Sequence, residues 1–274
     1  MKRLCYSFLQ QADRIWNAIA EADQYGLSYG EETITDNVLL YLKKHHRRHV
    51  HLRSFSKKEE RHNGADWEWW IGREGQWNGM RVQAKRIKLP REEYKSLFYK
   101  SKKSTKLQID HLIDEAIANN LTPIFTLYSH SKKLLHLQTK NNHCYPSRNG
   151  PFNQNGCLVA HAQHVRNTGS LKLSDIESFS FPWHLLACDC SVDLGPSRGP
   201  GTNPSNISQM LAYPFEGAPT GEDDIFVAEP NKVLPDHMRA IMKDDGESQT
   251  WIEKYCREWN LAGLALIDLG KRDE

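Results

Sequence analysis

The sequence predicts an α/β protein in which a central mixed β-sheet is flanked by helices. Apolar residues recur at helical spacing in residues 4–24, 31–42 and 108–117. Shorter apolar or alternating stretches at 50–55, 64–70, 81–86 and 121–128 have the length and composition of β-strands. Since helices and strands alternate along the chain, we expect the helices to cover the faces of one sheet.

The first half of the chain orders these elements as two helices, three strands, a helix and a strand. The second helix begins near Glu31 and ends in the basic run KKHHRRH at 43–49. A turn at 72–79, which contains three glycines, joins the second and third strands. Gln108 opens the third helix after a lysine-rich stretch, and 121–128 reads as a buried strand.

The second half of the chain is less regular in its pattern. Helices are predicted at 235–244 and 249–259, and the apolar run 261–269 is predicted to be a late buried strand of the same sheet. We therefore divide the chain into a core with N-terminal helices at 1–135 and a C-terminal elaboration at 136–274. The second unit either stands apart or packs on the sheet of the first.

Composition predicts a globular protein without a membrane partner. Of the 274 residues, 39% are hydrophobic and 26% charged, and no apolar run approaches the 18 residues of a transmembrane helix. The first residues lack the apolar run of a signal peptide, so a cytoplasmic location is expected. The six cysteines follow no repeating framework, which favours reduced thiols in that compartment.

The net charge of +2 hides a strong asymmetry along the chain. Residues 1–174 carry 28 Lys and Arg against 16 Asp and Glu, a net charge of +12, whereas residues 175–274 carry 8 against 18, a net charge of −10. A basic region of this size predicts a polyanionic partner, and the acidic part either avoids that partner or packs against the basic part.

Two neighbouring strands place polar side chains on one face. Successive side chains of a strand point to opposite faces, so Asp66 and Glu68 share a face, as do Gln83 and Lys85. Carboxylate and amide oxygens next to a lysine can hold a divalent metal and position water for attack on phosphate. Trp67 and Trp69 alternate with the acids and should face the core, whereas Trp77 in the turn is expected to be exposed.

The order of Asp66 followed by Gln83-Ala84-Lys85 resembles the PD-(D/E)xK restriction-endonuclease-like superfamily. The string Val-Gln-Ala-Lys-Arg at 82–86 is similar to the QxK variant of Mrr-type nucleases. This resemblance covers about a third of the chain, from Glu31 to Tyr128, and implies a restriction-endonuclease-like core that hydrolyses DNA with Mg²⁺ or Mn²⁺.

The resemblance also implies roles for single residues. The metal would be held by Asp66, Gln83, the Ala84 carbonyl and a helix glutamate. Lys85 would position the attacking water or stabilise the charge that develops on the phosphate. For the helix glutamate we expect Glu32, with Glu31 as the alternative, because adjacent helix residues point about 100° apart and only one can face the metal. Glu68 and Gln108 are additional candidates.

The predicted function is that of a metal-dependent endonuclease acting on DNA phosphodiester bonds, in a bacterial restriction or phage-defence setting that the resemblance implies. A homodimer is expected by analogy alone. Two alternatives stay open: a nucleic-acid-binding protein of this fold without catalysis, and a protein-interaction or sensor module that uses its acidic part. We expect six basic residues to contact nucleic-acid phosphates: Lys43, Lys44, Arg47, Arg48, Arg86 and Lys88.

Overall fold

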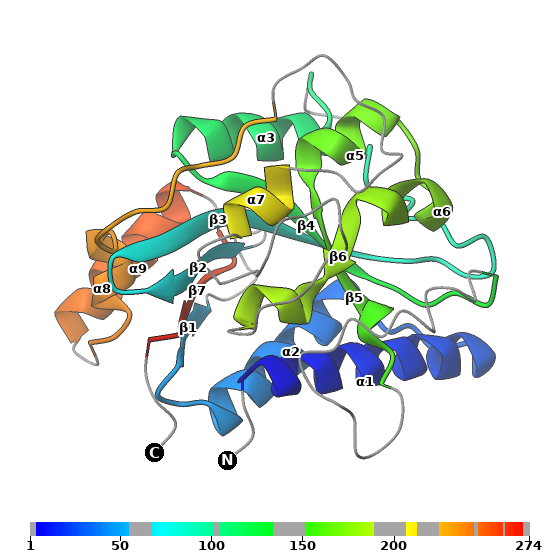
Figure 1. Ribbon diagram of the computed structural model, residues 1–274, viewed down its shortest axis with the longest axis horizontal. Helices are drawn as coiled ribbons and strands as arrows, with labels where there is room; N and C mark the ends of the chain where they lie inside the picture. The colour runs from blue at the N-terminus through cyan, green and yellow to red at the C-terminus, as the bar shows by residue number, and fades with distance from the viewer. Residues whose placement is uncertain are drawn as a thin grey trace.

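The computed structural model describes residues 4–54, 67–100, 105–133, 152–188, 207–212, 225–243, 246–259 and 261–270. In this part of the chain, seven strands form one mixed sheet in the order β1-β7-β2-β3-β4-β5-β6. Helices cover the sheet on both faces (Figure 1). The predicted α/β class, a mixed sheet flanked by helices, is confirmed.

The first half of the chain follows the predicted order. Its elements are α1 (Leu4–Gln24), α2 (Glu31–His45), β1 (Val50–Ser54), β2 (Trp67–Arg73), β3 (Gln76–Arg86), α3 (Gln108–Ala118) and β4 (Thr122–Tyr128). β2 and β3 form an antiparallel hairpin, and β4 runs parallel to β3 after the α3 crossover. The strand-to-helix-to-parallel-strand connection places α3 over one face of β3 and β4.

The rest of the chain adds strands at both sides of this core. Its elements are η1 (Gln154–Gly156), β5 (Cys157–His161), α5 (Ala162–Thr168), α6 (Leu173–Ile176), η2 (Glu177–Phe179), β6 (Ser180–Pro182), η3 (Trp183–Ala187), α7 (Ile207–Ala212), α8 (Asp236–Ala240), α9 (Gly246–Glu258) and β7 (Gly263–Asp268). The strand expected at 261–269 is therefore present.

β7 lies between two strands from the beginning of the chain. It pairs in parallel with β2 and antiparallel with β1. Together with β5 and β6, which extend the other side of the sheet, it makes one sheet from both halves of the chain. A division at residue 135 therefore does not separate two sheets.

The two faces of the β2–β3 hairpin have different partners. Trp67 lies opposite Val82 and Trp69 opposite Met80, and this face packs in the large hydrophobic core that includes α1 and α2. In Figure 1 these two helices lie below the sheet and α3 lies above it. Trp67 and Trp69 are thus core residues, as expected.

Trp77 is buried, so the expectation that it is exposed is wrong. It belongs to a second hydrophobic cluster, with Trp70 and residues of α8 and α9. Its backbone also pairs with Asn231, which brings a distant segment over the hairpin. The turn that contains Trp77 is therefore covered by a later part of the chain.

Among the described residues, no helix is long and apolar enough to cross a membrane. Cys188 is disulfide-bonded, so the expectation of reduced thiols is wrong for this residue. Cys5, Cys157 and Cys256 are buried and are not joined in a disulfide. Burial raises the pKa of the Cys256 thiol to about 12, which makes it a core residue and not a nucleophile at neutral pH.

Candidate functional site

Three polar side chains alternate with apolar ones along β3. Arg81, Gln83 and Lys85 are at most 5% exposed and point to the α3 face of the sheet. Val82 and Ala84 point to the opposite face, into the large core. Period-two alternation thus concentrates a guanidinium, an amide and an ammonium on one buried face of a single strand.

Lys85 contacts the first residue of α3. Its Nζ donates a hydrogen bond to Gln108 Oε1 at 2.8 Å. Gln108, which the sequence offered only as an additional candidate, thus lies beside Lys85. An amide oxygen fixes the position of the ammonium without neutralising its charge, as a carboxylate would.

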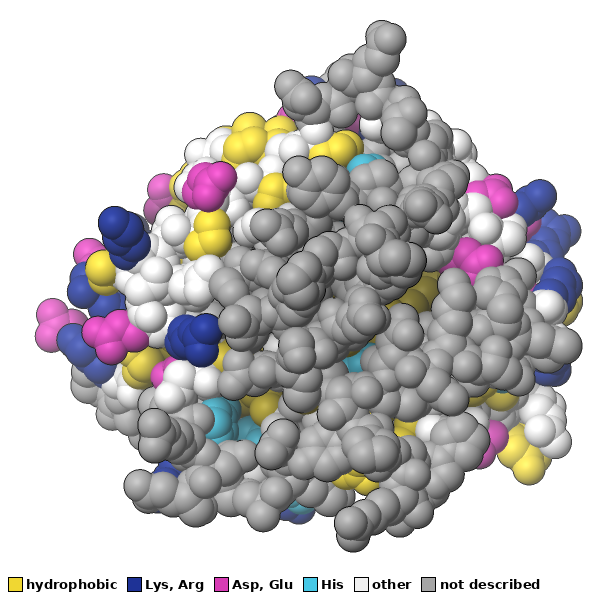
Figure 2. All heavy atoms as spheres, viewed as in Figure 1, with side chains coloured by type: hydrophobic (Ala, Val, Ile, Leu, Met, Phe, Trp, Pro, Cys, Tyr) yellow, Lys and Arg dark blue, Asp and Glu magenta, His cyan; other side chains and the backbone are white. Residues whose placement is uncertain are grey.

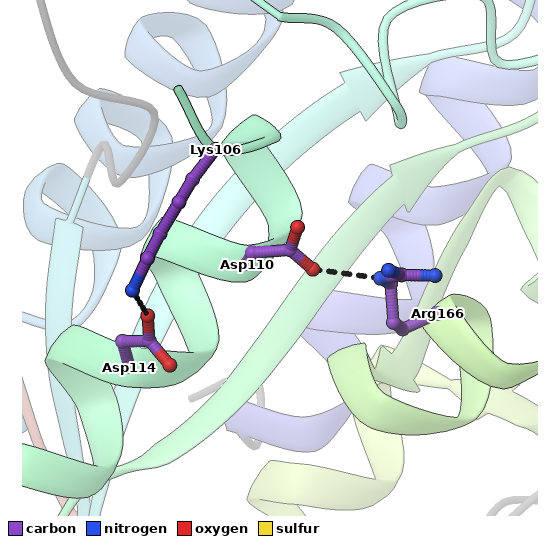
Figure 3. A network of polar contacts seen from close by, with 4 residues as sticks. All are labelled: Lys106, Asp110, Asp114 and Arg166. Carbon is purple, nitrogen blue, oxygen red and sulfur yellow. Dashed lines mark hydrogen bonds and ion pairs between the residues drawn. The ribbon is translucent and has the colours of Figure 1, made fainter. Parts of the chain in front are cut away.

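The position of Gln108 is fixed by the packing of α3 on the core more than by the ion pairs on the surface of the helix. Ile109 and Leu112 anchor the inner face of α3 in the core. On the outer side, Asp110 pairs with Arg166 of α5 at 2.7 Å, and Lys106 pairs with Asp114 at 2.6 Å (Figure 3). Exposed ion pairs of this kind contribute little to stability, so the buried apolar residues fix the helix.

Gln83 is the residue of the predicted site whose buried amide lacks hydrogen-bond partners among the described residues. It is 1% exposed, and within the described part of the chain neither its Oε1 nor its Nε2 has a hydrogen-bond partner. A buried polar group without a partner costs about 1–3 kcal/mol, and such groups in folded proteins call for an explanation such as a bound ion or water. The amide oxygen is suited to be a metal ligand.

Glu31 reaches the end of β3. Its Oε1 accepts a hydrogen bond from the Arg86 backbone N–H at 3.0 Å. The first turn of α2 is fixed there because Thr35 Oγ1 lies 2.8 Å from the hydroxyl of Tyr128 on β4 and also donates to the Glu31 carbonyl. The carboxylate is therefore positioned by two strands of the sheet.

Of the two glutamates, the structure favours the alternative, Glu31, over the expected Glu32. Glu32 is exposed, whereas Glu31 is half-buried against β3. Glu31 precedes the buried residues Ile34, Thr35 and Val38 by three, four and seven positions, which puts it on the buried face of α2. This spacing is visible in the sequence and was the signal that could have identified Glu31.

The Ala84 carbonyl points toward the same edge of β3 as the Glu31 carboxylate. Ile87 N–H donates to Tyr128 on β4, so the Arg86 N–H, one residue earlier, points away from β4. Peptide groups two residues apart in a strand point the same way, and Ala84 is two residues before Arg86. Its carbonyl is thus directed to the side of β3 that Glu31 approaches.

These donors fit a hard divalent cation in type. A carboxylate from Glu31, a backbone carbonyl from Ala84 and an amide oxygen from Gln83 are oxygen ligands of the kind that Mg²⁺ accepts. Asp66 lies outside the described residues and directly precedes the first residue of β2. Across the described ranges, no group of three or more His, Cys, Asp or Glu is placed to hold a metal. The described part therefore offers one carboxylate and two neutral oxygens.

Glu68, expected as an additional acid beside Asp66, is engaged elsewhere. Its carboxylate accepts hydrogen bonds from Trp70 Nε1 at 2.7 Å and Tyr255 OH at 3.0 Å, and it lies 2.6 Å from His237 Nε2. The imidazole of His237 stacks on the Tyr255 ring, with 4.1 Å between centroids. His237 belongs to α8 and Tyr255 to α9, so Glu68 ties the C-terminal helices to the sheet.

Arg81 is a buried cation that sequence reasoning missed. It lies opposite Glu68 in the hairpin and is fully buried, and none of its three side-chain nitrogens has a hydrogen-bond partner in the part of the chain that the structure describes. Burial alone raises the pKa of Glu68, yet the hydrogen bond from His237 and the charges of His237 and Arg81 hold that pKa below its ordinary value. Arg81 alternates with Gln83 and Lys85 along β3, and this alternation is the sequence pattern from which its position on the same face could have been predicted.

The predicted phosphate-contacting residues fall into two groups. Lys44, Arg47 and Arg48 are exposed at the C-terminal end of α2, and Lys43 donates to the Val50 carbonyl. Arg86 is buried and Lys88 exposed near the opposite end, because Glu31 at the start of α2 contacts Arg86. Lys43 comes twelve positions after Glu31 in the helix, which is a rise of roughly 18 Å along its axis. The six residues therefore do not form one patch.

The described surface in Figure 2 carries charges of both signs. Lys and Arg side chains are interspersed with Asp and Glu over α8 and α9 and at the opposite side of this view. The part of this face that the structure describes thus offers no basic area free of acids. The charge asymmetry of the sequence is not visible as a single-sign surface there.

Comparison with known proteins gives one match. The model of a family described as a family of unknown function, DUF6615, matches residues 4–269. No curated protein matches the chain, and no solved structure matches it. The chemistry of the site is therefore the basis on which a function can be proposed.

Proposed function

The chain belongs to the DUF6615 family, whose function is unknown, and from its site we propose that it is a metal-dependent nuclease that hydrolyses DNA phosphodiester bonds. The observation that carries the proposal is the hydrogen bond between Lys85 of β3 and Gln108 of α3. The Glu31 carboxylate reaches the same strand, because it accepts a hydrogen bond from the Arg86 backbone at the end of β3. The helix, three strands, helix and strand that frame these residues support it. A restriction or phage-defence role stays part of the proposal through the resemblance alone.

Each residue has a distinct chemical task in this proposal. Glu31, Gln83, the Ala84 carbonyl and Asp66 would hold a divalent cation, which supplies a polarised phosphate and a water of lowered pKa. Lys85 stabilises the negative charge that develops on the phosphate oxygens as water attacks. Gln108 keeps the Lys85 ammonium in place, and the buried walls of β3 and α3 limit its alternative rotamers.

The direct test is incubation of the full chain with supercoiled plasmid, linear duplex and single-stranded DNA. Parallel reactions contain Mg²⁺, Mn²⁺ or EDTA. We expect cleavage with a metal and none with EDTA. The absence of cleavage of all three substrates under both metals, in protein that is folded, would contradict the proposal.

The glutamine at position 83 provides a sharper test of metal binding. Gln83→Glu adds a carboxylate with almost no change of volume, and Mg²⁺ binds an anionic oxygen more strongly than a neutral one. The Mg²⁺ concentration for half-maximal cleavage should therefore fall, with activity kept or raised. Metal titrations of both proteins measure this, and Gln76→Glu at the half-buried first residue of β3 is the matched control that should leave the titration unchanged. A Gln83→Glu variant with an unaltered metal requirement would place residue 83 outside the metal shell.

The same glutamine is the observation that favours a second candidate, a DNA-binding protein without catalysis. A neutral amide leaves fewer charged ligands than a catalytic metal site usually has. If the protein only binds DNA, we expect equal DNA affinity in the presence of Mg²⁺ and of EDTA, and we expect the DNA to stay intact under both conditions. If the protein is a nuclease, the DNA should be cleaved with metal and stay intact with EDTA. A single cleavage assay therefore distinguishes the two candidate functions.

A further inference from the structure

A pocket of about 360 Å³ lies between α1 and α2, away from the β3 site. The two helices lie side by side on one face of the sheet in Figure 1. Its lining includes Gln11 and Arg14 of α1, Tyr29 between the helices, and Asn37, Tyr41 and Lys44 of α2. Ligand pockets in proteins are typically about 300–1,000 Å³, so this one suits a small molecule and not a folded partner.

The charged groups of the pocket wall have one sign. Arg14 comes from α1, and Lys44 and His45 come from the last turn of α2. None of the described residues that line the pocket is Asp or Glu. A concave site with two permanent cations and an imidazole, without a lining carboxylate, favours an anionic ligand. An arginine and a lysine together are the residues that most often bind phosphate.

The centre of the wall is aromatic. The Tyr41 ring lies near the Arg14 guanidinium, which is 5.9 Å from the ring centroid, and near the His45 ring, with 4.3 Å between the two ring centroids. The Tyr41 hydroxyl is fixed by a hydrogen bond to Gln10 Oε1 at 3.3 Å. Tyr29 contributes a second ring to the lining. Tyrosine rings held in this way offer flat surfaces on which a planar heterocycle can stack.

A buried amide of the pocket lacks a partner. Gln11 is 4% exposed and lines the pocket, and within the described ranges its Nε2 has no hydrogen-bond partner. Leaving such a donor unsatisfied costs about 1–3 kcal/mol, which an acceptor atom of a ligand would relieve. Asn37 provides a second amide from α2. Amides are the side chains that best match the paired donors and acceptors of a nucleobase edge.

We propose that this pocket binds a nucleotide, with its phosphate on Arg14 and Lys44, its base against the tyrosines and an acceptor atom toward Gln11. The ligand is either a free mononucleotide or the phosphorylated terminal nucleotide of a strand, which share this chemistry. The site is separate from the β3 residues and does not depend on the nuclease proposal.

The test is isothermal titration of the full chain in EDTA with AMP, GMP, CMP and UMP, and with adenosine and inorganic phosphate. Because no DNA is cleaved in this assay, its result is independent of nuclease activity. At least one nucleotide should bind, at least ~10-fold more tightly than adenosine or phosphate alone. A 5′-phosphorylated 12-mer that competes with the nucleotide identifies a strand end as the source, and a 12-mer that does not compete identifies the free nucleotide.

Variants locate the binding site. Arg14→Gln removes an exposed cation without disturbing the core and should weaken nucleotide binding at least ~10-fold while leaving adenosine binding unchanged. Tyr41→Leu should weaken it similarly, and Tyr41→Phe, which keeps the ring, should restore most of the affinity. Arg257→Gln on α9 makes the same charge change on an exposed residue far from the pocket and serves as the control. No binding of any of the four nucleotides, or binding that Arg14→Gln leaves intact, overturns the proposal.

Discussion

Replacement of Lys85 by methionine is expected to lower the rate of DNA cleavage by ~10²–10³-fold, the effect of removing one preformed charge stabiliser from an active site. The Lys85 ammonium is buried on β3 and held by Gln108 Oε1 at 2.8 Å, so it is already in position before substrate binds. Methionine fills a similar volume and has no charge, so the core around it should be kept. Single-turnover cleavage with saturating Mg²⁺ measures the loss.

Two further variants make this test specific. Lys95→Met removes a lysine from an exposed position after β3 and should cleave DNA like the unmodified protein. Gln108→Ala should lower the rate less than Lys85→Met does, because it removes only the group that positions the ammonium. The double variant should be no slower than Lys85→Met alone, since residues that act as one unit are not additive. Lys85→Met protein that binds DNA and retains more than about a tenth of the activity would exclude the proposed role.

The elements of this site could be predicted because their signals are local. Val82, Gln83, Ala84 and Lys85 alternate over four residues, which is enough to assign faces of β3 before any fold is known. The start of α3 at Gln108 follows from helical spacing within eleven residues. The same local rule, applied to α2, would have selected Glu31, because it precedes Thr35 by one helical turn.

What could not be predicted depends on partners far away in the chain. Glu68 meets His237 and Tyr255, which lie 169 and 187 residues later, so no local pattern reveals that its carboxylate is already engaged. The local sequence around Trp77 predicts an exposed turn, and only the backbone pairing with the distant Asn231 shows that this position is covered. The run 261–269 is visible as a strand, but its position between β1 and β2 is a property of the assembled sheet.

Replacement of Glu68 by glutamine is expected to destabilise the fold by about 3–5 kcal/mol, because it removes the buried carboxylate that lies 2.6 Å from His237 Nε2. The substitution keeps the volume but also removes the negative charge that interacts with the fully buried Arg81 guanidinium across the hairpin. Urea unfolding at neutral pH measures the difference. Glu258→Gln, an exposed change at the end of α9, should stay within about 0.5 kcal/mol of the unmodified protein.

A double-mutant cycle separates the charge pair from the rest of the cluster. Arg81→Met fills the buried space without a charge, and combined with Glu68→Gln it removes both interacting charges. If the two charges stabilise each other, the loss in the double variant should be smaller than the sum of the single losses by about 0.5–3 kcal/mol. Additive losses would show that Glu68 acts through His237, Tyr255 and Trp70 and not through Arg81.

The pH dependence of stability gives an independent check on Glu68. Burial raises the pKa of this carboxyl, but the hydrogen bond and charge of His237, with the charge of Arg81, hold it below the ordinary value of 4.5. A carboxyl whose pKa is depressed in the folded state contributes stability above the unfolded-state pKa, and this contribution is lost as the pH falls through the folded-state value. The difference in unfolding free energy between the unmodified protein and Glu68→Gln should therefore be constant near neutrality and shrink below about pH 4.5. A difference that stays the same from pH 7 to pH 3 would mean that the glutamate stabilises this helix–sheet contact by its shape and hydrogen bonds, and not as an anion.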